Sequence, residues 1–254
     1  MALLELDDCA LSFGGLTAVN GVALALDAGE LVGLIGPNGA GKTTVFNLIT
    51  GIYAPVRGTI RLGGRDIAGL SPARINRRGI ARTFQGVRLF PGLTAYENVM
   101  AGYSPRVGSV LGAVLGTAHA DAVRDRVAAD CMGLLRMLAL EPHAHVAARA
   151  LPYGAQRRLE IARALATAPK LLLLDEPAAG TTPQEKVELM ERIRWLRETL
   201  GLGILVIEHD MKLIMEICDR ITVLNYGEVI AVGCPQEIRR DPKVIAAYLG
   251  EERP

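Results

Sequence analysis

Apolar and polar positions alternate in short runs along the N-terminal part of the chain. Leu3–Leu6, Val22–Leu26 and Thr59–Leu62 alternate or run apolar, and each is bounded by Gly or Asp. Alternation with a period of two between turn residues is typical of half-buried β-strands. This part of the chain is therefore predicted to form short strands joined by turns.

The pattern changes at Glu30–Ile35, where the apolar run ELVGLI indicates a buried strand. A glycine-rich loop follows at once, and residues 43–53 (TTVFNLITGIY) have the character of a helix. Strand, glycine-rich loop and helix in this order form the βα unit of a nucleotide-binding sheet.

Residues from about 95 to 150 are rich in Ala, Leu and Arg, and they predict a helical subdomain. Their apolar positions at helical spacing are Val127, Met132, Leu134, Leu135 and Leu138. The last third returns to α/β alternation. Its expected strands and helices are Leu171–Leu174, Pro183–Leu200, Ile204–Ile207, Met211–Cys218, Ile221–Leu224 and a closing helix Gln236–Leu249.

Composition narrows the class of protein. A chain of 254 residues, half of them apolar, can bury the core of one large α/β domain. The net charge of +1 argues against a nucleic-acid protein held by a general electrostatic field. The most membrane-like run, Val107–Ala118, is too short and too rich in glycine to span a bilayer. Any membrane association is therefore expected to go through a partner.

The cysteines are scattered and form no C-x-x-C pair, which favours reduced, buried thiols over disulfides or zinc. They are Cys9, Cys131, Cys218 and Cys234. His143 and His145 have no third ligand nearby, which argues against a metal site there.

The loop GPNGAGKT is a complete G-x-x-x-x-G-K-[ST] motif. Backbone N–H groups of such a loop cradle a β-phosphate, helped by the N-terminus of the next helix. Lys42 is expected to reach the β- and γ-phosphates, the Thr43 hydroxyl to bind Mg²⁺, and Thr44 to bond the α-phosphate. Gly39 and Gly41 are expected to have positive φ. The candidate ATP-binding residues here are Gly36, Pro37, Asn38, Gly39, Ala40, Gly41, Lys42, Thr43 and Thr44.

Two later apolar strands end in polar residues. Leu171–Pro177 reads LLLLDEP and Ile204–Asp210 reads ILVIEHD. Open α/β sheets bind ligands at the carboxyl ends of their strands. Asp175 is therefore expected to hold Mg²⁺, and Glu176 to accept a proton from the attacking water. His209 is expected to contact the γ-phosphate rather than to be structural.

Two further residues complete the candidate site. Gln85, in ARTFQGVRLF, is a candidate contact for the metal and the attacking water. Phe13, in SFGGLTAV, is a candidate for stacking on adenine, against the alternative of an ordinary core phenylalanine.

An arginine cluster raises a nucleic-acid alternative. Its members are Arg74, Arg77, Arg78 and Arg82. Because the net charge of the chain is close to zero, we favour the interpretation that these arginines lie on a solvated face near Gln85 over nucleic-acid binding.

In order along the chain, these features resemble the ATP-binding subunits of ABC transporters. They are Phe13, the phosphate loop Gly36–Thr43, Gln85, a signature region Leu151–Gln156, the acidic pair Asp175 and Glu176, and His209. The resemblance covers nearly the whole chain. It implies ATP and Mg²⁺ as ligands, with Glu176, His209 and Gln85 as catalytic residues and Thr43, Gln85 and Asp175 at the metal.

The same resemblance implies a fold. The expected class is α/β: a P-loop NTPase with a RecA-like core, an N-terminal antiparallel β subdomain and an inserted α-helical subdomain. Residues 1–254 are expected to form a single ABC ATPase cassette. Residues 1–92 and 161–254 are assigned to the core and β subdomain, and 93–160 to the helical (signature) subdomain.

A narrower similarity is to the subfamily that serves high-affinity branched-chain amino acid importers. It is carried by FGGLTAVNGV, ARTFQGVRLFPGLTAYENV, YGAQRRLEIARALA, LLLLDEPAAG and IEHDMKLIMEICDRITVLNYGEVIAVGCPQEI, and by the insert around Ser104–Asp121. ATP-binding subunits of the same subfamily pattern also serve some urea, amide and other amino-acid importers. These solutes remain the alternative to branched-chain amino acids as the cargo.

The subfamily resemblance also implies partners. The expected partners are two membrane permease subunits, a second copy or a sister ATPase in a dimer, and a periplasmic or extracellular solute-binding protein. No nucleic acid is expected. The expected location is the cytoplasmic face of the inner membrane, reached through the permease subunits.

Two departures from the subfamily concern the dimer interface. The signature tends to read L-A-Y-G-Q-Q-R there, whereas this chain reads LPYGAQR, with Pro152 and Ala155 unusual. The stretch after the acidic pair tends to read G-L-N-P, whereas Thr182 stands here in place of the asparagine. The signature residues expected to face the ATP of the partner subunit are Pro152, Tyr153, Gly154, Ala155 and Gln156.

Pro152 removes a hydroxyl and an N–H group, and losing one hydrogen bond to a charged group costs about 1.5–3 kcal/mol. Gly154 and the helix N-terminus still offer donors. With the phosphate loop, Asp175 and Glu176 intact, a weakened but working site is predicted. One alternative is a non-hydrolysing partner subunit, which Glu176 opposes. Another is a soluble ABC ATPase of DNA repair or translation, which needs a coiled-coil insert or a second cassette.

Overall fold

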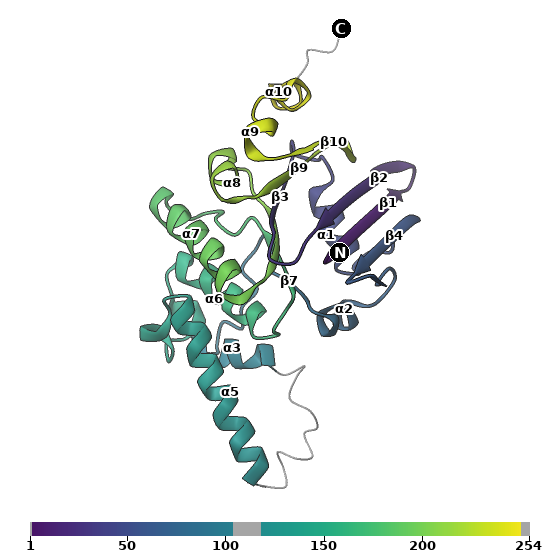
Figure 1. Ribbon diagram of the computed structural model, residues 1–254. Helices are drawn as coiled ribbons and strands as arrows, with labels where there is room; N and C mark the ends of the chain where they lie inside the picture. Colours follow the sequence, from purple (N-terminus) through teal and green to yellow (C-terminus); the bar gives the residue numbers. More distant parts are fainter. Residues whose placement is uncertain (1, 104–117, 250–254) are drawn as a thin grey trace.

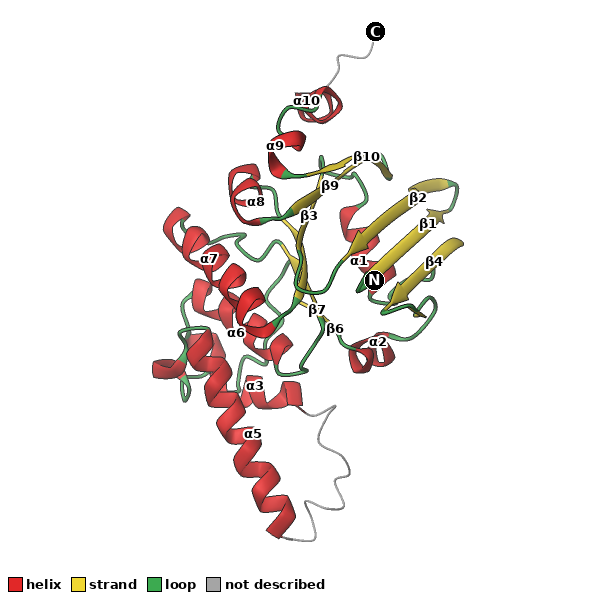
Figure 2. Ribbon diagram, viewed as in Figure 1, coloured by secondary structure: helices red, strands yellow, loops and turns green. Residues whose placement is uncertain are grey.

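The computed structural model describes residues 2–103 and 118–249 and shows two β-sheets with helices packed around them (Figures 1 and 2). The apolar run 107–118 and the insert 104–121 lie almost entirely outside the described residues. Where the chain is described, no helix combines the length and the apolar character needed to cross a bilayer.

The larger sheet follows the strand order β10-β9-β3-β8-β7-β6. Its strands are β3 (Leu31–Ile35), β6 (Ile80–Arg82), β7 (Leu171–Asp175), β8 (Gly203–Ile207), β9 (Arg220–Asn225) and β10 (Glu228–Gly233). Neighbouring strands are parallel except for β10, which pairs with β9 in the antiparallel sense. The predicted α/β architecture is therefore confirmed.

Strand β7 shows why its four leucines form an unbroken run. Leu171 and Leu173 pack in the hydrophobic cluster around helix α1 (Lys42–Ile49), and Leu172 and Leu174 pack in the cluster on the opposite face. Parallel sheets covered on both faces need apolar residues at every position rather than at alternate ones.

The smaller sheet follows the order β2-β1-β4-β5, and its strand pairs are antiparallel. Its strands are β1 (Leu4–Phe13), β2 (Leu16–Leu26), β4 (Arg57–Leu62) and β5 (Arg65–Asp66). Strand β1 is longer than predicted because register shifts after Leu6, with Asp8 at φ 47°, interrupt the alternation without ending the pairing. Helix α1 is buried between the two sheets.

Helices α6 (Tyr153–Leu165), α7 (Pro183–Leu200) and α8 (Met211–Ile217) lie on the side of the larger sheet that points away from the smaller one (Figure 2). Helices α3 (Ala95–Tyr103) and α5 (Ala118–Met137) pack against each other and against α6, farther from the sheet. Short elements complete the chain at α2 (Pro72–Arg78) and the 3₁₀ turns η1 (Glu141–His143) and η2 (Ala148–Ala150).

The helical character predicted for the middle of the chain is confirmed. Leu135 and Leu138 of the α5 region are buried, and the other predicted apolar positions pack against the same cluster. The expected subdomain boundary at residue 160 falls inside the continuous helix α6. The division into core and helical subdomains stays a prediction.

The single closing helix predicted over Gln236–Leu249 is wrong. Two short helices, α9 (Pro235–Ile238) and α10 (Pro242–Leu249), occupy this stretch. Pro242 lacks an N–H group and disfavours helical geometry in the residue before it, so it begins a new helix instead of continuing the old one.

Candidate active site

The loop between β3 and α1 requires glycine for steric reasons. Gly36, Gly39 and Gly41 have φ of 150°, 81° and 101°. A Cβ at Gly36 would lie 2.0 Å from the Leu224 carbonyl oxygen, and one at Gly41 would lie 2.7 Å from the Ala18 carbonyl oxygen. The backbone of this loop therefore passes close to β9 and β2 in a way that side chains would prevent.

Helix α1 begins at Lys42 and presents an uncapped N-terminus to the loop. Its N-cap, Gly41, offers no side-chain cap, and its first turn has no acidic residue. The Lys42 Nζ donates to the carbonyl oxygens of Gly36 and Pro37 at 2.7 and 2.9 Å. Burial lowers the pKa of Lys42, while the nearby carboxylates Glu176 and Asp175 oppose this shift. Free N–H groups beside a lysine favour an anion.

A cavity of about 640 Å³ opens over this loop. It is lined by Leu16, Thr17, Ala18, Asn38, Gly39, Ala40, Gly41, Lys42, Thr43, Thr44, Gln85, Glu176, His209 and Tyr226. The cavity brings most of the predicted phosphate-loop residues together with the three predicted catalytic residues. Leu16 and Tyr226 are lining residues that the sequence analysis did not single out, although both lie in stretches that resemble the branched-chain subfamily.

Glu176 contacts both of the other predicted catalytic side chains. The Gln85 Nε2 donates to both carboxylate oxygens of Glu176, at 3.2 and 3.1 Å. The His209 Nε2 lies 2.8 Å from Glu176 Oε1. Strands β6, β7 and β8 are neighbours, so their carboxyl ends carry these three residues to one edge of the sheet.

Asp175 is buried, and its Oδ2 accepts a hydrogen bond from Arg82 Nη2 at 2.7 Å. The expectation that Arg82 belongs to a solvated face is therefore wrong, because its side chain is only 7% exposed. Arg82 ends strand β6, which pairs with β7, and the buried carboxylate at the end of β7 gives its charge a partner.

Glu208 is a buried residue that the sequence analysis did not single out. Its carboxylate accepts from the backbone N–H groups of Ala178 and His209, at 2.8 and 3.1 Å. Burial raises the pKa of Glu208. The contacts tie the segment after Glu176 to the histidine. The sequence feature that could have identified Glu208 is its place as an acidic residue at the end of the apolar run ILVIEH.

Residues 84–88, here named the glutamine loop, are bonded to helix α6 by two buried side chains that the sequence analysis also missed. Arg157 donates to the carbonyl oxygens of Phe84 and Gln85, at 3.1 and 2.6 Å. The Glu160 Oε1 accepts from the N–H groups of Phe84 and Arg88, both at 3.4 Å. The backbone that carries Gln85 is therefore fixed to the helix that follows the signature.

The signature residues lie at the start of helix α6 and outside the cavity lining. Pro152 is the N-cap, and the Gln156 N–H donates to its carbonyl oxygen at 3.0 Å. Ala155 is 3% exposed and packs in the hydrophobic core, so its side chain is not available to a ligand. A Cβ at Gly154 would lie 2.6 Å from the Glu185 carboxylate, which explains the glycine there.

Phe13, predicted to stack on adenine, is not among the lining residues of the cavity. Its ring is 43% exposed and makes an edge contact with Tyr53, with centroids 5.0 Å apart. The stacking role stays a prediction.

Thr182 keeps the helix cap at the position where the subfamily has asparagine. Its Oγ1 accepts from the Glu185 N–H at 3.3 Å, and Glu185 Oε2 accepts from the Thr182 N–H at 2.9 Å. This reciprocal pair is a capping box at the start of helix α7.

Replacing Thr182 with Ala is expected to lower the free energy of unfolding by about 1 kcal/mol, because the cap is lost. Thr182→Asn is the matched control and should change it by no more than a few tenths, since asparagine also caps well. Urea denaturation of the three proteins measures the difference. An unchanged midpoint for Thr182→Ala would show that the capping box does not stabilise α7.

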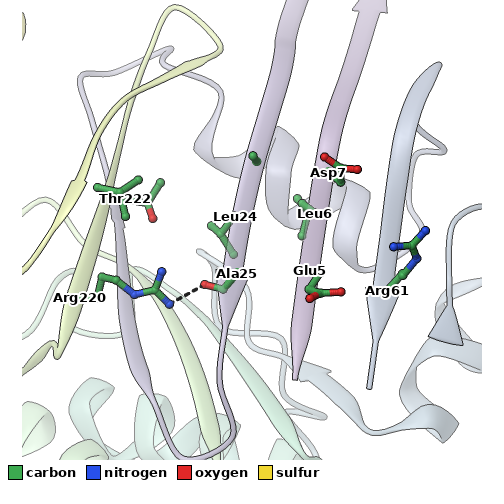
Figure 3. A pocket seen from close by; sticks show the side chains of 10 residues that line it. Glu5, Leu6, Asp7, Leu24, Ala25, Arg61, Arg220 and Thr222 are labelled. Carbon is green, nitrogen blue, oxygen red and sulfur yellow. Dashed lines mark hydrogen bonds between the residues drawn. The ribbon is translucent and has the colours of Figure 1, made fainter. Parts of the chain in front are cut away.

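A second groove, of about 410 Å³, lies between the smaller sheet and strand β9 (Figure 3). Its Arg220 points toward strand β2 and donates to the Ala25 carbonyl oxygen at 2.8 Å. The same guanidinium is paired with Glu30 at 2.8 Å. None of the predicted site residues lines this groove.

A glycine-rich phosphate loop lies between β3 and α1 and shares one cavity with Gln85, Glu176 and His209, at the carboxyl edge of a mostly parallel sheet. This arrangement defines a P-loop nucleotide-binding domain of the ATP-binding-cassette class. The sequence profile of the family "ABC transporter" matches residues 19–179, and that of "Branched-chain amino acid ATP-binding cassette transporter" matches residues 228–254. The chain belongs to the ABC transporter ATP-binding family.

Two curated relatives cover the chain from end to end. The high-affinity branched-chain amino acid transport ATP-binding protein BraF of Pseudomonas aeruginosa is 47% identical over 98% of both chains. The corresponding protein LivG of Escherichia coli K12 is 48% identical, also over 98% of both chains.

Solved structures are similar as well. The ADP conformation of an ATP-binding cassette of an ABC transporter is 30% identical, with a TM-score of 0.85 over 99% of this chain and 100% of that one. A dimeric post-hydrolysis state of another cassette, bound to ADP and Pi, is 26% identical, with a TM-score of 0.77 over 91% and 98%.

Proposed function

We propose that this chain is the ATP-hydrolysing subunit of an ABC importer for branched-chain amino acids. The observation that carries the proposal is the contact of Glu176 with both Gln85 and His209 in the cavity over the phosphate loop. The names of the two curated relatives support the cargo. Urea, amides and other amino acids are the alternative cargo, which no contact in this chain favours.

The residues of the cavity fit ATP and Mg²⁺. The loop backbone and the N-terminus of α1 offer donors to phosphate oxygens, and Lys42 adds a positive charge beside them. The Thr43 hydroxyl lies in the cavity lining, and Asp175 is the buried carboxylate at the end of β7. Thr43 and Asp175 would hold Mg²⁺, which would neutralise negative charge that develops on the phosphate oxygens.

In this proposal Glu176 is the general base for the water that attacks the γ-phosphate. His209 and Gln85 hold its carboxylate from two sides, at 2.8 Å and at 3.1–3.2 Å. Because the carboxylate accepts from the Gln85 amide, its direction is set before substrate arrives. Residues of the phosphate loop keep the γ-phosphate on the facing wall of the cavity.

The active assembly is a dimer, either of two copies or with a sister ATPase. Pro152 and Tyr153 are exposed and lie outside their own chain's cavity lining, so the start of helix α6 can face a partner's nucleotide. Two permease subunits and a solute-binding protein complete the importer, with this subunit at the cytoplasmic face of the membrane. Reconstitution with permease subunits in vesicles, and ATP-dependent uptake of leucine against urea, tests the cargo.

Replacing Lys42 with Ala is expected to weaken ATP binding by about 10- to 100-fold, because a charge-assisted contact to phosphate is lost. Fluorescence of a labelled ATP analogue measures the affinity. Lys212→Ala, at an exposed lysine on α8, is the matched control and should bind normally. Equal affinity in Lys42→Ala and the control would contradict the assignment of the phosphate loop.

A further inference from the structure

Arg82 has an environment unlike that of a surface arginine. Its Nη2 donates to Asp175 Oδ2 at 2.7 Å, and its Nη1 donates to Asn47 Oδ1 at 2.7 Å. The Thr50 Oγ1 lies 3.4 Å from the same Nη1. The two charged side chains are 7% and 4% exposed. One guanidinium therefore joins the carboxylate at the end of β7 to two polar side chains of helix α1.

Aromatic rings hold the guanidinium as well. Its central carbon lies 5.3 Å from the ring centroid of Phe46 and 5.1 Å from that of Phe84. Cations within about 6 Å of an aromatic face are attracted to it. Because these rings and Asn47 fix Arg82 independently of Asp175, the arginine is a rigid support for the carboxylate and not a mobile counter-ion.

Helix α1 connects this support to the phosphate loop. Thr43, Asn47 and Thr50 are spaced i, i+4 and i+7, so they share one face of the helix. Thr43 stands in the first turn and in the cavity lining. The face of α1 that presents the Thr43 hydroxyl is therefore the face to which Arg82 ties Asp175.

We propose that Arg82 is a positioning residue that orients the Asp175 carboxylate, relative to Thr43, for the magnesium ion of MgATP. The inference rests on the proposed function, because it assumes that MgATP occupies the cavity. The bond from Arg82 goes to Oδ2 of Asp175, so the arginine sets the orientation of the whole carboxylate. Asp175 is buried beneath the cavity lining, and in this proposal it acts on the ion through water. Groups that orient a ligating side chain set metal affinity as strongly as many direct ligands do.

The test measures ion affinity apart from catalysis. Each protein is saturated with a non-hydrolysable ATP analogue, and Mn²⁺ is titrated while electron paramagnetic resonance reports the free ion. Arg82→Gln is expected to weaken Mn²⁺ binding by about 10-fold or more. Its affinity for the analogue in EDTA should remain within about two-fold of the unaltered protein, since the phosphate donors are untouched.

Two further variants separate orientation from charge and from folding. Asn47→Leu leaves the Arg82–Asp175 pair in place but removes the shorter of the two hydrogen bonds from Arg82 to the α1 side chains, and it should also weaken Mn²⁺ binding. Arg82→Lys keeps the charge but cannot span both partners, and it should fall between Arg82→Gln and the unaltered protein. Arg78→Gln, at an exposed arginine of α2, is the control and should bind normally.

Unchanged Mn²⁺ affinity in Arg82→Gln would overturn the proposal, and so would tighter binding, which would make Arg82 a competitor of the ion. If Arg82→Gln does not fold, unchanged affinity in Asn47→Leu overturns it equally. If the unaltered protein binds no ATP analogue, the proposed function itself is wrong, and this outcome appears before any substitution is compared.

Discussion

Replacing Glu176 with Gln is expected to slow ATP hydrolysis by about 10²- to 10⁴-fold while ATP binding persists. The substitution keeps the shape of the side chain and an oxygen for the Gln85 amide, but it removes the base. The Glu176 carboxylate lies 2.8 Å from the His209 Nε2 and also accepts from the Gln85 amide. Among the described residues, no other carboxylate contacts both of these side chains. The steady-state release of phosphate measures the rate.

The same variant also reports on the unusual signature. If Pro152 and Ala155 still allow closure, Glu176→Gln should shift from monomer to dimer in gel filtration when Mg-ATP is added, because the closed state no longer turns over. Glu216→Gln, at an exposed position on α8, is the control and should hydrolyse ATP at the normal rate. Hydrolysis by Glu176→Gln within about ten-fold of the control would contradict the role of general base.

An ATP-dependent dimer and its absence have different meanings for the assembly. A dimer would show that Gly154 and the N-terminus of α6 suffice without the signature hydroxyl. A protein that binds ATP but stays monomeric would indicate a heterodimer in which a sister subunit supplies the stronger signature.

The phosphate loop and the acidic pair were predictable because their chemistry is written in contiguous residues. A glycine–lysine–threonine loop after an apolar strand, and acids at the end of another, specify both the local geometry and the ligand. That Glu176 and His209 lie at one edge of the sheet followed from the rule that parallel strands end there. No strand was predicted before Gln85, so its contact with Glu176 did not follow from this rule.

Arg82, Arg157 and Glu160 were not predictable in the same way. Their partners lie 93, 72 and 76 residues away, and for two of the three these partners are backbone atoms, which no residue type reveals. The charge pattern alone placed Arg82 on a solvated face. A buried charge depends on what the fold brings beside it, and that information is absent from local spacing.

Removing one member of the buried pair Arg157 and Glu160 should lower stability, because each charge depends on the groups that the fold brings beside it. Arg157→Met is expected to lower the free energy of unfolding by about 3–5 kcal/mol, because it removes one of the two arginine charges near the buried Glu160 carboxylate, the other being that of Arg163. It also leaves the carbonyl oxygens of Phe84 and Gln85 without their donors. Urea denaturation measures the change. Arg126→Met, at an exposed position on α5, is the control and should unfold at the same urea concentration as the unaltered protein.

Combining Arg157→Met with Glu160→Gln tests whether the two side chains act as one unit. Burial raises the pKa of Glu160, against the N–H groups of Phe84 and Arg88 and the charge of Arg157, which lower it. A raised pKa means that the carboxyl favours folding below its unfolded-state pKa and that this contribution is lost as pH rises through the folded-state pKa. Glu160→Gln cannot ionise, so the stability of the double variant should fall less steeply with rising pH than that of Arg157→Met.

The loss of unfolding free energy in the double variant is compared with the sum of the losses in the two single variants. If the losses add and the pH curves are parallel, Arg157 and Glu160 hold the glutamine loop independently. If the double variant loses less than the sum, the buried charge, rather than the lost hydrogen bonds, dominates the cost.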